Sequence, residues 1–419
     1  MNITLNDLIK NKIVNSRIYG VSKPLVIKEM YCIPNDINIK KLNKMIDSYY
    51  DSFYIKKEWA KTKPTKEERI SSFLNTNKVM SKRYDSIPEG DSKESYRKIS
   101  VINTLWLKKS QKKFNKYLMN ILLTDKIRGK KQESIVPYLH SSVKQRSYVT
   151  NANTHVGNKY VLALDLKDFY PSVTKKKICD FFVNEFNLPY DIAMFYAVLS
   201  TCKSEDNVYK LGQGLSQSAT LAYLVNYKLF NYIYEFALRD NIEMSIYVDD
   251  IIFSSSSPIP QKFIDKLFGL IKDNGMEIKK KKVHNYKRES TKKITGVYIN
   301  GKKTRVAAKK HEETNIQYKY LKRNIILINK LDEYYKIYNL YLRFYGNYQH
   351  ILMVEKKVQD KYDKFIKEYD KYFPKGINKK QKNLNYQRGN IKNSSDIYKI
   401  NSCYQNLKNR NNKLKERKR

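Results

Sequence analysis

The sequence is poor in residues that interrupt secondary structure and in residues that form cross-links. Its 419 residues include 13 glycines and 10 prolines, about half of the roughly 12 per cent that average proteins contain. So few helix breakers predict long helices. The cysteines are equally scarce and lie far apart, which excludes a closely spaced metal-binding motif and predicts reduced thiols. They are Cys32, Cys179, Cys202 and Cys403.

Long apolar runs are missing as well. No run reaches the 18 or so residues that a membrane-spanning helix needs, and residues 1–12 lack the apolar core of a signal peptide. The five histidines are scattered and form no zinc motif. We therefore expect a cytoplasmic protein with no membrane partner.

Acidic residues are few compared with basic ones. The chain has 82 Lys plus Arg against 41 Asp plus Glu, a formal net charge of +41. This excess predicts a polyanionic partner, because each cationic side chain that replaces a counterion on a phosphate adds favourable entropy. Abundant Lys, Asn, Ile and Tyr are also typical of an AT-rich genome, so a solvated basic surface is the alternative interpretation.

Three of the acidic residues stand where strands are expected to end. The segment Tyr247-Val248-Asp249-Asp250 separates two short apolar runs and predicts a β-hairpin with two adjacent carboxylates at its tip. Residues 160–164 predict a buried strand that ends at Asp165. Neighbouring carboxylates repel one another, and a divalent cation is the usual relief. For Asp168 we expect a structural hydrogen bond or salt bridge instead.

A glycine-rich turn lies between the two acidic segments. Residues 211–218 contain Gln213 between two glycines and run into a helical pattern over residues 219–238. This order of strand, turn and acidic hairpin resembles the catalytic motifs of reverse transcriptases. The resemblance implies an α+β right-hand polymerase fold with fingers, palm and thumb, and an RNA-directed DNA polymerase that uses dNTPs. It also implies that two Mg2+ ions are held by the catalytic residues Asp165, Asp249 and Asp250.

The same resemblance implies which residues contact the incoming nucleotide. Arg97, on a strand expected near residues 94–101, matches an arginine that contacts the triphosphate. Tyr170 matches an aromatic ring that collides with a ribose 2′-hydroxyl and so selects deoxynucleotides, with Phe169 as the alternative. The amide of Gln213 is expected to bond template or base-pair edges.

Lys282 completes the expected nucleotide site. It follows Gly275 by seven positions, the spacing of a lysine that protonates the pyrophosphate leaving group in enzymes of this type. Residues 279–282 are all lysines, so a solvated basic run is the alternative interpretation.

Two short segments narrow the resemblance to bacterial retron reverse transcriptases. Asn151-Ala-Asn-Thr-His155 precedes the first catalytic strand, and Ile294-Thr295-Gly296 follows the lysine run. Asn151, His155, Thr295 and Gly296 are therefore expected to position RNA template, with His155 directed toward template or backbone. A retron enzyme would copy a cognate structured noncoding RNA from one of its 2′-hydroxyls, giving a branched RNA–DNA product. It would serve antiphage defence with a separate effector protein.

Three other functions remain open at this point. The chain could be another defence-associated or abortive-infection reverse transcriptase, a group II intron enzyme, or a catalytically inactive RNA-binding scaffold. In each case we expect the same five parts of the chain. These are an N-terminal helical extension (1–75), fingers (76–150), palm (151–301), helical thumb (302–373) and a flexible basic tail (374–419).

Overall fold

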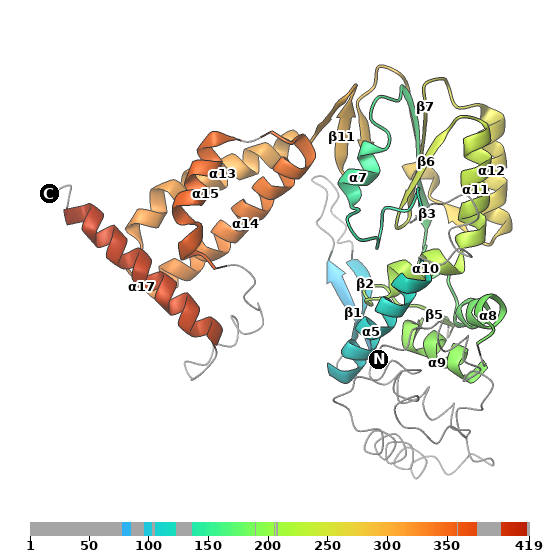
Figure 1. The fold of residues 1–419 in the computed structure, drawn as a ribbon, viewed down its shortest axis with the longest axis horizontal. Helices are drawn as coiled ribbons and strands as arrows, with labels where there is room; N and C mark the ends of the chain where they lie inside the picture. Colours follow the sequence, from blue (N-terminus) through green and yellow to red (C-terminus); the bar gives the residue numbers. More distant parts are fainter. Residues whose placement is uncertain are drawn as a thin grey trace, which may run out of the picture. The chain divides into compact units, whose positions relative to one another are not determined.

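The structure is a computed structural model that describes most of the chain from the fingers onward. It describes residues 78–84, 96–102, 105–122, 136–374 except positions 189, 205, 207 and 358, and 395–416. The expected N-terminal extension, residues 1–75, lies outside this range. The chain divides into two compact units, residues 1–289 and 290–419, each drawn in Figure 1.

A five-stranded antiparallel sheet is the framework of the N-terminal unit. Its strands run in the order β6-β7-β3-β8, and β9 also pairs with β3. The central strand β3 is buried along most of its length, as its apolar sequence predicts. The strands are β3 (Tyr160–Lys167), β6 (Glu243–Tyr247), β7 (Asp250–Ser255), β8 (Glu277–Ile278) and β9 (His284–Tyr286).

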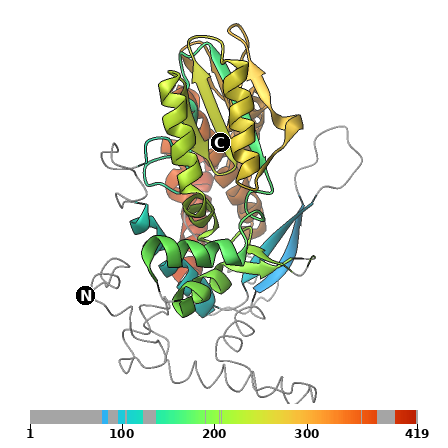
Figure 2. The same cartoon turned by 90° about the vertical axis from the view of Figure 1, so that its right-hand side faces the viewer.

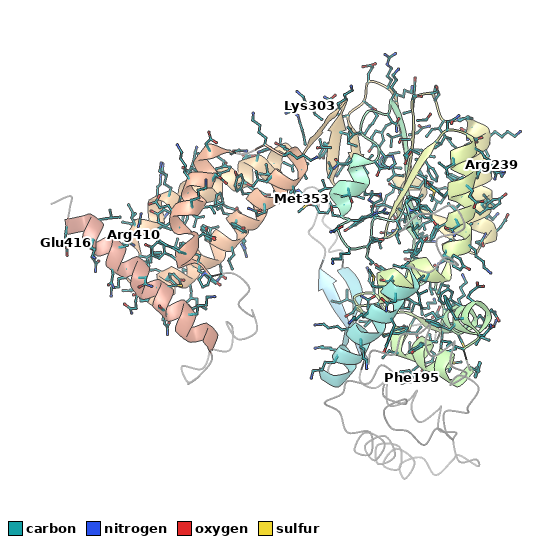
Figure 3. All side chains as sticks on the ribbon, viewed as in Figure 1. Phe195, Arg239, Lys303, Met353, Arg410 and Glu416 are labelled. Atoms are coloured by element: carbon teal, nitrogen blue, oxygen red, sulfur yellow. The ribbon has the colours of Figure 1, made fainter. Side chains whose placement is uncertain are left out.

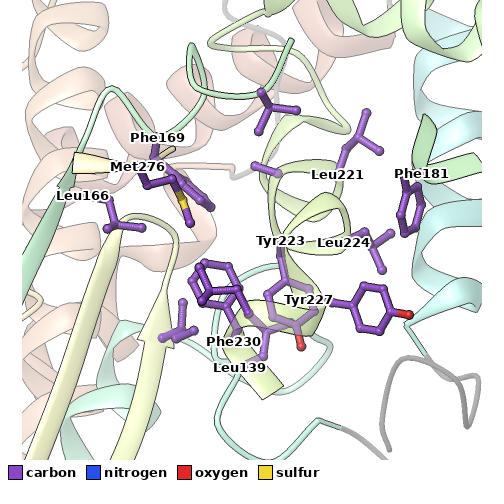
Figure 4. Packing of buried hydrophobic residues seen from close by; sticks show 14 of the residues in the cluster. Leu139, Leu166, Phe169, Phe181, Leu221, Tyr223, Leu224, Tyr227, Phe230 and Met276 are labelled. Atoms are coloured by element: carbon purple, nitrogen blue, oxygen red, sulfur yellow. The ribbon is translucent and has the colours of Figure 1, made fainter. Parts of the chain in front are cut away.

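Helices cover both faces of this sheet. Helices α11 (Tyr227–Arg239) and α12 (Gln261–Asp273) pack on one face, and the short α7 (Tyr148–Asn153) packs on the other (Figures 1 and 2). Successive side chains of β3, β6 and β7 therefore point alternately toward α11 and α12 on one face and toward α7 on the other. Leu166 joins Phe169 and Met276 in the core on the α11 and α12 side (Figure 4).

The remaining described residues of the N-terminal unit are mainly helical. Its buried contacts include the stacked rings of Phe114 and Tyr196, whose centroids are 4.4 Å apart. A two-stranded sheet of the expected fingers precedes these helices. The elements are β1 (Lys78–Tyr84), β2 (Tyr96–Ile102), α5 (Leu105–Ile121), α8 (Lys175–Phe186), α9 (Tyr190–Ser200), β4 (Thr201–Lys203), β5 (Tyr209–Leu211) and α10 (Ser218–Val225).

The C-terminal unit joins a small antiparallel sheet to a helical bundle. Because the unit begins at residue 290, the last residues of the expected palm (151–301) belong to this second unit. None of the helices in the described part of the chain is both long and apolar enough to cross a membrane. The elements are β10 (Lys292–Ile294), β11 (Val297–Asn300), β12 (Lys303–Arg305), α13 (Ala308–Asn324), η4 (Ile325–Leu327), α14 (Leu331–Glu355), α15 (Asp360–Tyr369), η5 (Asp370–Tyr372) and α17 (Ser395–Glu416).

The long helix α14 explains the many tyrosines of this region. Tyr334, Tyr338 and Tyr341 follow helical spacing and are fully buried. They belong to a stretch in which tyrosines alternate with basic residues, and Tyr320 of the same stretch is 53% exposed. At the start of α14 the Glu333 carboxylate accepts hydrogen bonds from the backbone N–H groups of Asn329 and Lys330.

The expectation of a flexible tail is wrong for residues 395–416. They form α17, in which Ile400, Tyr404 and Leu407 are buried against the other helices of the unit. Arg410, labelled in Figure 3, donates a hydrogen bond to the Tyr369 hydroxyl at 3.1 Å. The buried Asn411 amide donates to the Ile325 carbonyl at 2.9 Å. The helix is therefore part of the folded unit, and residues 375–394 lie outside the described range.

Candidate active site

Sheet register brings the three predicted carboxylates together. Asp165, near the end of β3, pairs directly with Asp250 at the start of β7. Directly opposed residues on antiparallel strands share one face, with Cβ atoms about 4.5 to 5.5 Å apart. The Asp249 carbonyl accepts a hydrogen bond from the Leu166 N–H at 2.9 Å, which fixes the hairpin tip to β3.

The hairpin tip carries backbone strain. Tyr247 pairs with Asp250, so the turn has only two residues between them, Val248 and Asp249. Val248 adopts a φ of 61°, a left-handed conformation that is uncommon for a β-branched residue and costs on the order of 1 to 3 kcal/mol. Such strain persists only where the surrounding structure holds it. Sequence spacing predicted the hairpin but gave no signal for this strain.

Electrostatic repulsion is built into the site. Burial, followed by the Asp165 charge, raises the pKa of Asp249. Burial, followed by the charges of Asp249 and Asp165, raises the pKa of Asp250 to about 6. A nearby positive charge would relieve both effects.

Two lysines supply positive charge at Asp165. Lys279 Nζ lies 2.5 Å from Asp165 Oδ1, and Lys282 Nζ lies 2.7 Å from Asp165 Oδ2. The 3₁₀ helix η3 (Lys280–Lys282) explains the pair, because residues three apart lie above one another in that helix. The hydrogen bond to Asp165 raises the pKa of Lys282. The sequence predicted Lys282 but not Lys279, since four consecutive lysines look alike before the turn is known.

The carboxylates provide the hard oxygen ligands that Mg2+ prefers. Among the described residues, no three His, Cys, Asp or Glu side chains already converge as a metal cage. A complete cage is not required, because Mg2+ is commonly held by one or two carboxylates together with water and substrate phosphates. The raised pKa values of Asp249 and Asp250 indicate a need for added cationic charge, so the donor set fits the ion.

Tyr170 lies beside the carboxylates, whereas Phe169 does not. Phe169 is 3% exposed and belongs to the core, as Figure 4 shows. The half-buried Tyr170 follows it in a turn that begins at Asp168, which has a φ of 47°. Burial, followed by the Asp249 charge, raises the pKa of Tyr170 to about 12, so its phenol stays neutral. This placement favours Tyr170 over Phe169 as the ring near an incoming nucleotide.

The turn around Gln213 is pressed against the fingers strand β2. The Ser100 N–H donates a hydrogen bond to the Gln213 carbonyl at 2.7 Å. A Cβ at Gly212 would lie 2.7 Å from Ser100 Oγ, and Gly214 has a φ of 98°, so both positions favour glycine. Ser100 was not predicted. Arg97 lies on the same strand, but its side chain is outside the described part of the structure.

The four residues expected to position RNA lie in two different places. Thr295 and Gly296 form the turn between β10 and β11, with positive φ values of 46° and 85°, in the C-terminal unit. Asn151 and His155 are both 0% exposed. Both side chains are therefore enclosed by the protein, and the expectation that they position RNA stays a prediction, in which they would act through neighbouring parts of the protein.

Comparison with known proteins gives one family match and several relatives. The family described as "Reverse transcriptase (RNA-dependent DNA polymerase)" matches residues 87–318. Retron Ec86 reverse transcriptase from Escherichia coli is 31% identical over 180 residues, which cover 42% of this chain and 54% of that protein. Retron Se72 reverse transcriptase from Salmonella heidelberg is 28% identical over 169 residues, covering 39% and 43% respectively. The chain thus spans about half the length of the curated relatives it matches.

Among solved structures, telomerases are similar at a lower level. Telomerase from Candida albicans, in complex with a fragment of telomeric RNA, has a TM-score of 0.38 at 13% identity, over 88% of this chain and 68% of that one. The corresponding complex from Candida tropicalis has a TM-score of 0.40 at 13% identity, over 71% and 57%.

Proposed function

Because the chain belongs to the reverse transcriptase family, we propose that it is an RNA-directed DNA polymerase that adds deoxynucleotides to a primer on an RNA template. The observation that carries this proposal is the sheet register, which places Asp165 directly opposite Asp250, with Asp249 next to them in the hairpin turn. The α+β fold and the polymerase family are those predicted from the motifs.

The three carboxylates are the proposed ligands of magnesium. When bound, two Mg2+ ions would lower the pKa of the primer hydroxyl and neutralise charge on the phosphates. The half-buried position of Asp249 and Asp250 restricts water there, which strengthens their interaction with cations. To bind a metal ion, Asp165 gives up its contacts with Lys279 and Lys282.

The neighbouring side chains then act on the nucleotide. The neutral ring of Tyr170 excludes a 2′-hydroxyl by steric contact, and the Gln213 turn brings backbone close to the base pair. Lys282 is more than half exposed, so its side chain can turn from Asp165 toward the triphosphate. There its ammonium group donates a proton to the pyrophosphate leaving group.

The similarity to retron reverse transcriptases supports a proposal for the substrate and the biological setting. We propose that the template is a cognate structured noncoding RNA, that a 2′-hydroxyl of this RNA is the primer, and that the product is branched RNA–DNA. The net charge of +41 supports a nucleic-acid partner. Antiphage defence with a separate effector protein is the setting we propose.

Replacing both hairpin carboxylates tests the proposed activity. Asp249→Asn combined with Asp250→Asn should abolish DNA synthesis and leave RNA affinity nearly intact, because the basic surface is retained. Asp168→Asn is the matched control, since Asp168 is exposed on the loop that follows β3. The measurements are primer extension with purified protein and RNA binding by filter retention. Undiminished synthesis by the double variant would contradict the assignment.

Nucleic acid that co-purifies with the wild-type protein tests the substrate. The sample is divided between ribonuclease and debranching treatment before sequencing. One abundant small RNA joined to DNA through a debranchable 2′–5′ link supports the retron product. Unlinked DNA would support another defence-associated reverse transcriptase, and RNA without DNA would support the inactive scaffold.

A further inference from the structure

A buried histidine connects the two strands of the acidic hairpin. His155 Nε2 lies 2.7 Å from Ser245 Oγ on β6, and His155 Nδ1 lies 2.7 Å from Ser254 Oγ on β7. All three side chains are 0% exposed. Both ring nitrogens are therefore used inside the protein, and each of them holds a different strand.

The serines lie on the same face of the sheet as the carboxylates. Along β7, Asp250 and Ser254 are four residues apart and so point to the same side. On β6, Ser245 and Tyr247 share that side, and Tyr247 pairs with Asp250. A slip of one residue between the strands would turn the Asp250 side chain to the opposite face. The bonds of His155 to both strands oppose such a slip.

The imidazole is neutral in this environment. Burial, followed by the charge of His140, lowers the pKa of His155 to about 3, so the ring has one donor and one acceptor nitrogen at neutral pH. Asn158 Nδ2 donates a hydrogen bond to Ser254 Oγ at 2.7 Å. Ser254 can then donate its own proton to His155 Nδ1, which leaves Nε2–H to donate to Ser245 Oγ.

Strain at the hairpin tip explains why such a connection is needed. The positive φ of Val248 is maintained only if the flanking strands are held in register. One side of β6 pairs with β7. On its other side the described residues make a short parallel bridge, in which the Ile246 N–H donates to the Tyr138 carbonyl at 2.7 Å and the His140 N–H donates to the Ile246 carbonyl at 2.9 Å. A side-chain connection across β6 and β7 adds a restraint that the backbone ladder alone does not supply.

We propose that His155 is a positioning residue that locks the register of the β6–β7 hairpin and thereby fixes where Asp249 and Asp250 stand relative to Asp165. The role of the three carboxylates as metal ligands rests on the proposed function. His155 itself contacts neither metal nor nucleotide. Its loss should therefore weaken metal binding while RNA affinity is retained. Residues that orient metal ligands typically change metal affinity or activity by about 10- to 100-fold when they are replaced.

The experiment compares metal binding among variants of the full-length protein. Mn2+ binding is followed by electron paramagnetic resonance, with the Asp249→Asn, Asp250→Asn double variant defining binding outside the site. His155→Leu and Ser245→Ala should each weaken Mn2+ binding by about tenfold. The double variant His155→Leu, Ser245→Ala should lose no more Mn2+ affinity than the more affected single variant, because both substitutions break the same connection. His155→Gln, which retains a group able to reach Ser245, should recover part of the affinity.

His140 provides a matched control. It is also a buried histidine, but its two ring nitrogens contact threonine hydroxyls, 2.9 Å from Thr150 Oγ1 and 3.3 Å from Thr154 Oγ1. His140→Leu should lower the melting temperature but leave Mn2+ affinity unchanged.

Several outcomes would overturn the proposal. The proposal is wrong if Ser245→Ala and His155→Gln both bind Mn2+ with wild-type affinity. This test remains valid even if His155→Leu fails to fold. An equal loss of affinity in His140→Leu would show a general effect of a destabilised core. If the wild-type protein makes no DNA, the proposed function fails, and the Mn2+ comparison still decides whether His155 positions the carboxylates.

Discussion

The two units use polar and aromatic side chains in opposite ways. In the N-terminal unit, buried polar groups surround the sheet beside the carboxylates, and the hairpin tip is strained at Val248. In the C-terminal unit, half of the buried residues of α14 are tyrosines, whose hydroxyls reach acceptors inside the unit. The hydroxyls of Tyr334 and Tyr338 donate to the carbonyls of Tyr372 and Pro374 at 2.7 and 2.6 Å.

We interpret this difference as a division of roles, in which the first unit holds the reactive groups and the second unit is built for stability. Carboxylates that repel one another destabilise the fold locally, and they are retained only where surrounding bonds fix them. The tyrosines of α14 bury large apolar rings without leaving a hydroxyl unsatisfied. Rings interleaved with lysines in the sequence are therefore not all surfaces for stacking on RNA bases. We expect substitutions in the first unit to change catalysis most, and those in the second to change stability most.

The largest effect on stability is expected at Tyr341. Its ring is fully buried, stacks on Phe373 at 4.5 Å and donates a hydrogen bond to Asp370 at 3.0 Å. Tyr341→Ala should lower the free energy of unfolding of the C-terminal unit by about 3 to 5 kcal/mol, as other buried aromatic truncations do. Urea denaturation measures the change, with Tyr320→Ala as the control because Tyr320 is 53% exposed. Equal losses from the two variants would contradict the division between core and surface rings.

A smaller effect is expected at Leu407 of α17. The side chain is fully buried against the C-terminal unit, so Leu407→Ala should destabilise that unit by about 2 to 4 kcal/mol. Lys408→Ala is the neighbouring control. An unchanged unfolding midpoint for Leu407→Ala would restore the original interpretation of this segment as a tail. Deleting residues 374–419 cannot test RNA binding alone, because it also removes part of the core.

The placement of the acidic motifs could be predicted because their signals are local. Strand periodicity, the end of an apolar run at Asp165 and a two-residue turn between apolar runs each depend on neighbouring residues. The α17 helix also left a local signal, since Ile400, Tyr404, Leu407 and Asn411 are spaced by four, three and four positions. Low aliphatic content hid this pattern.

Contacts between distant segments could not be predicted from one sequence. The bonds of His155 to Ser245 and Ser254 span 90 and 99 positions, and nothing near His155 indicates which strands it meets. The contact of Lys279 with Asp165 and the contact of Ser100 with the Gln213 turn also join distant segments, and neither could be predicted from the sequence. The motif alone therefore led us to expect His155 toward template or backbone, whereas the structure buries it against Ser245 and Ser254.

The smallest expected effect on stability is a dependence on pH. The N-terminal unit should show it because its buried histidines are neutral. The pKa of His155 is lowered to about 3, first by burial and then by the His140 charge, whereas a free imidazole titrates near 6.5. Between these values only the unfolded chain binds the proton, so stability falls as the pH drops from about 6.5 toward 3. At pH 5 the cost is about 2 kcal/mol relative to pH 8.

Comparing variants isolates this contribution from opposing groups. Asp250, with its pKa raised to about 6, binds protons more readily in the folded state and so acts in the opposite direction. Thermal unfolding of wild type and His155→Gln between pH 8 and pH 5 cancels that effect, because both proteins retain Asp250. The wild type should lose more stability on acidification than the variant, whatever their difference at pH 8. Parallel pH profiles would mean that His155 titrates like an exposed imidazole, which its two hydrogen bonds and complete burial oppose.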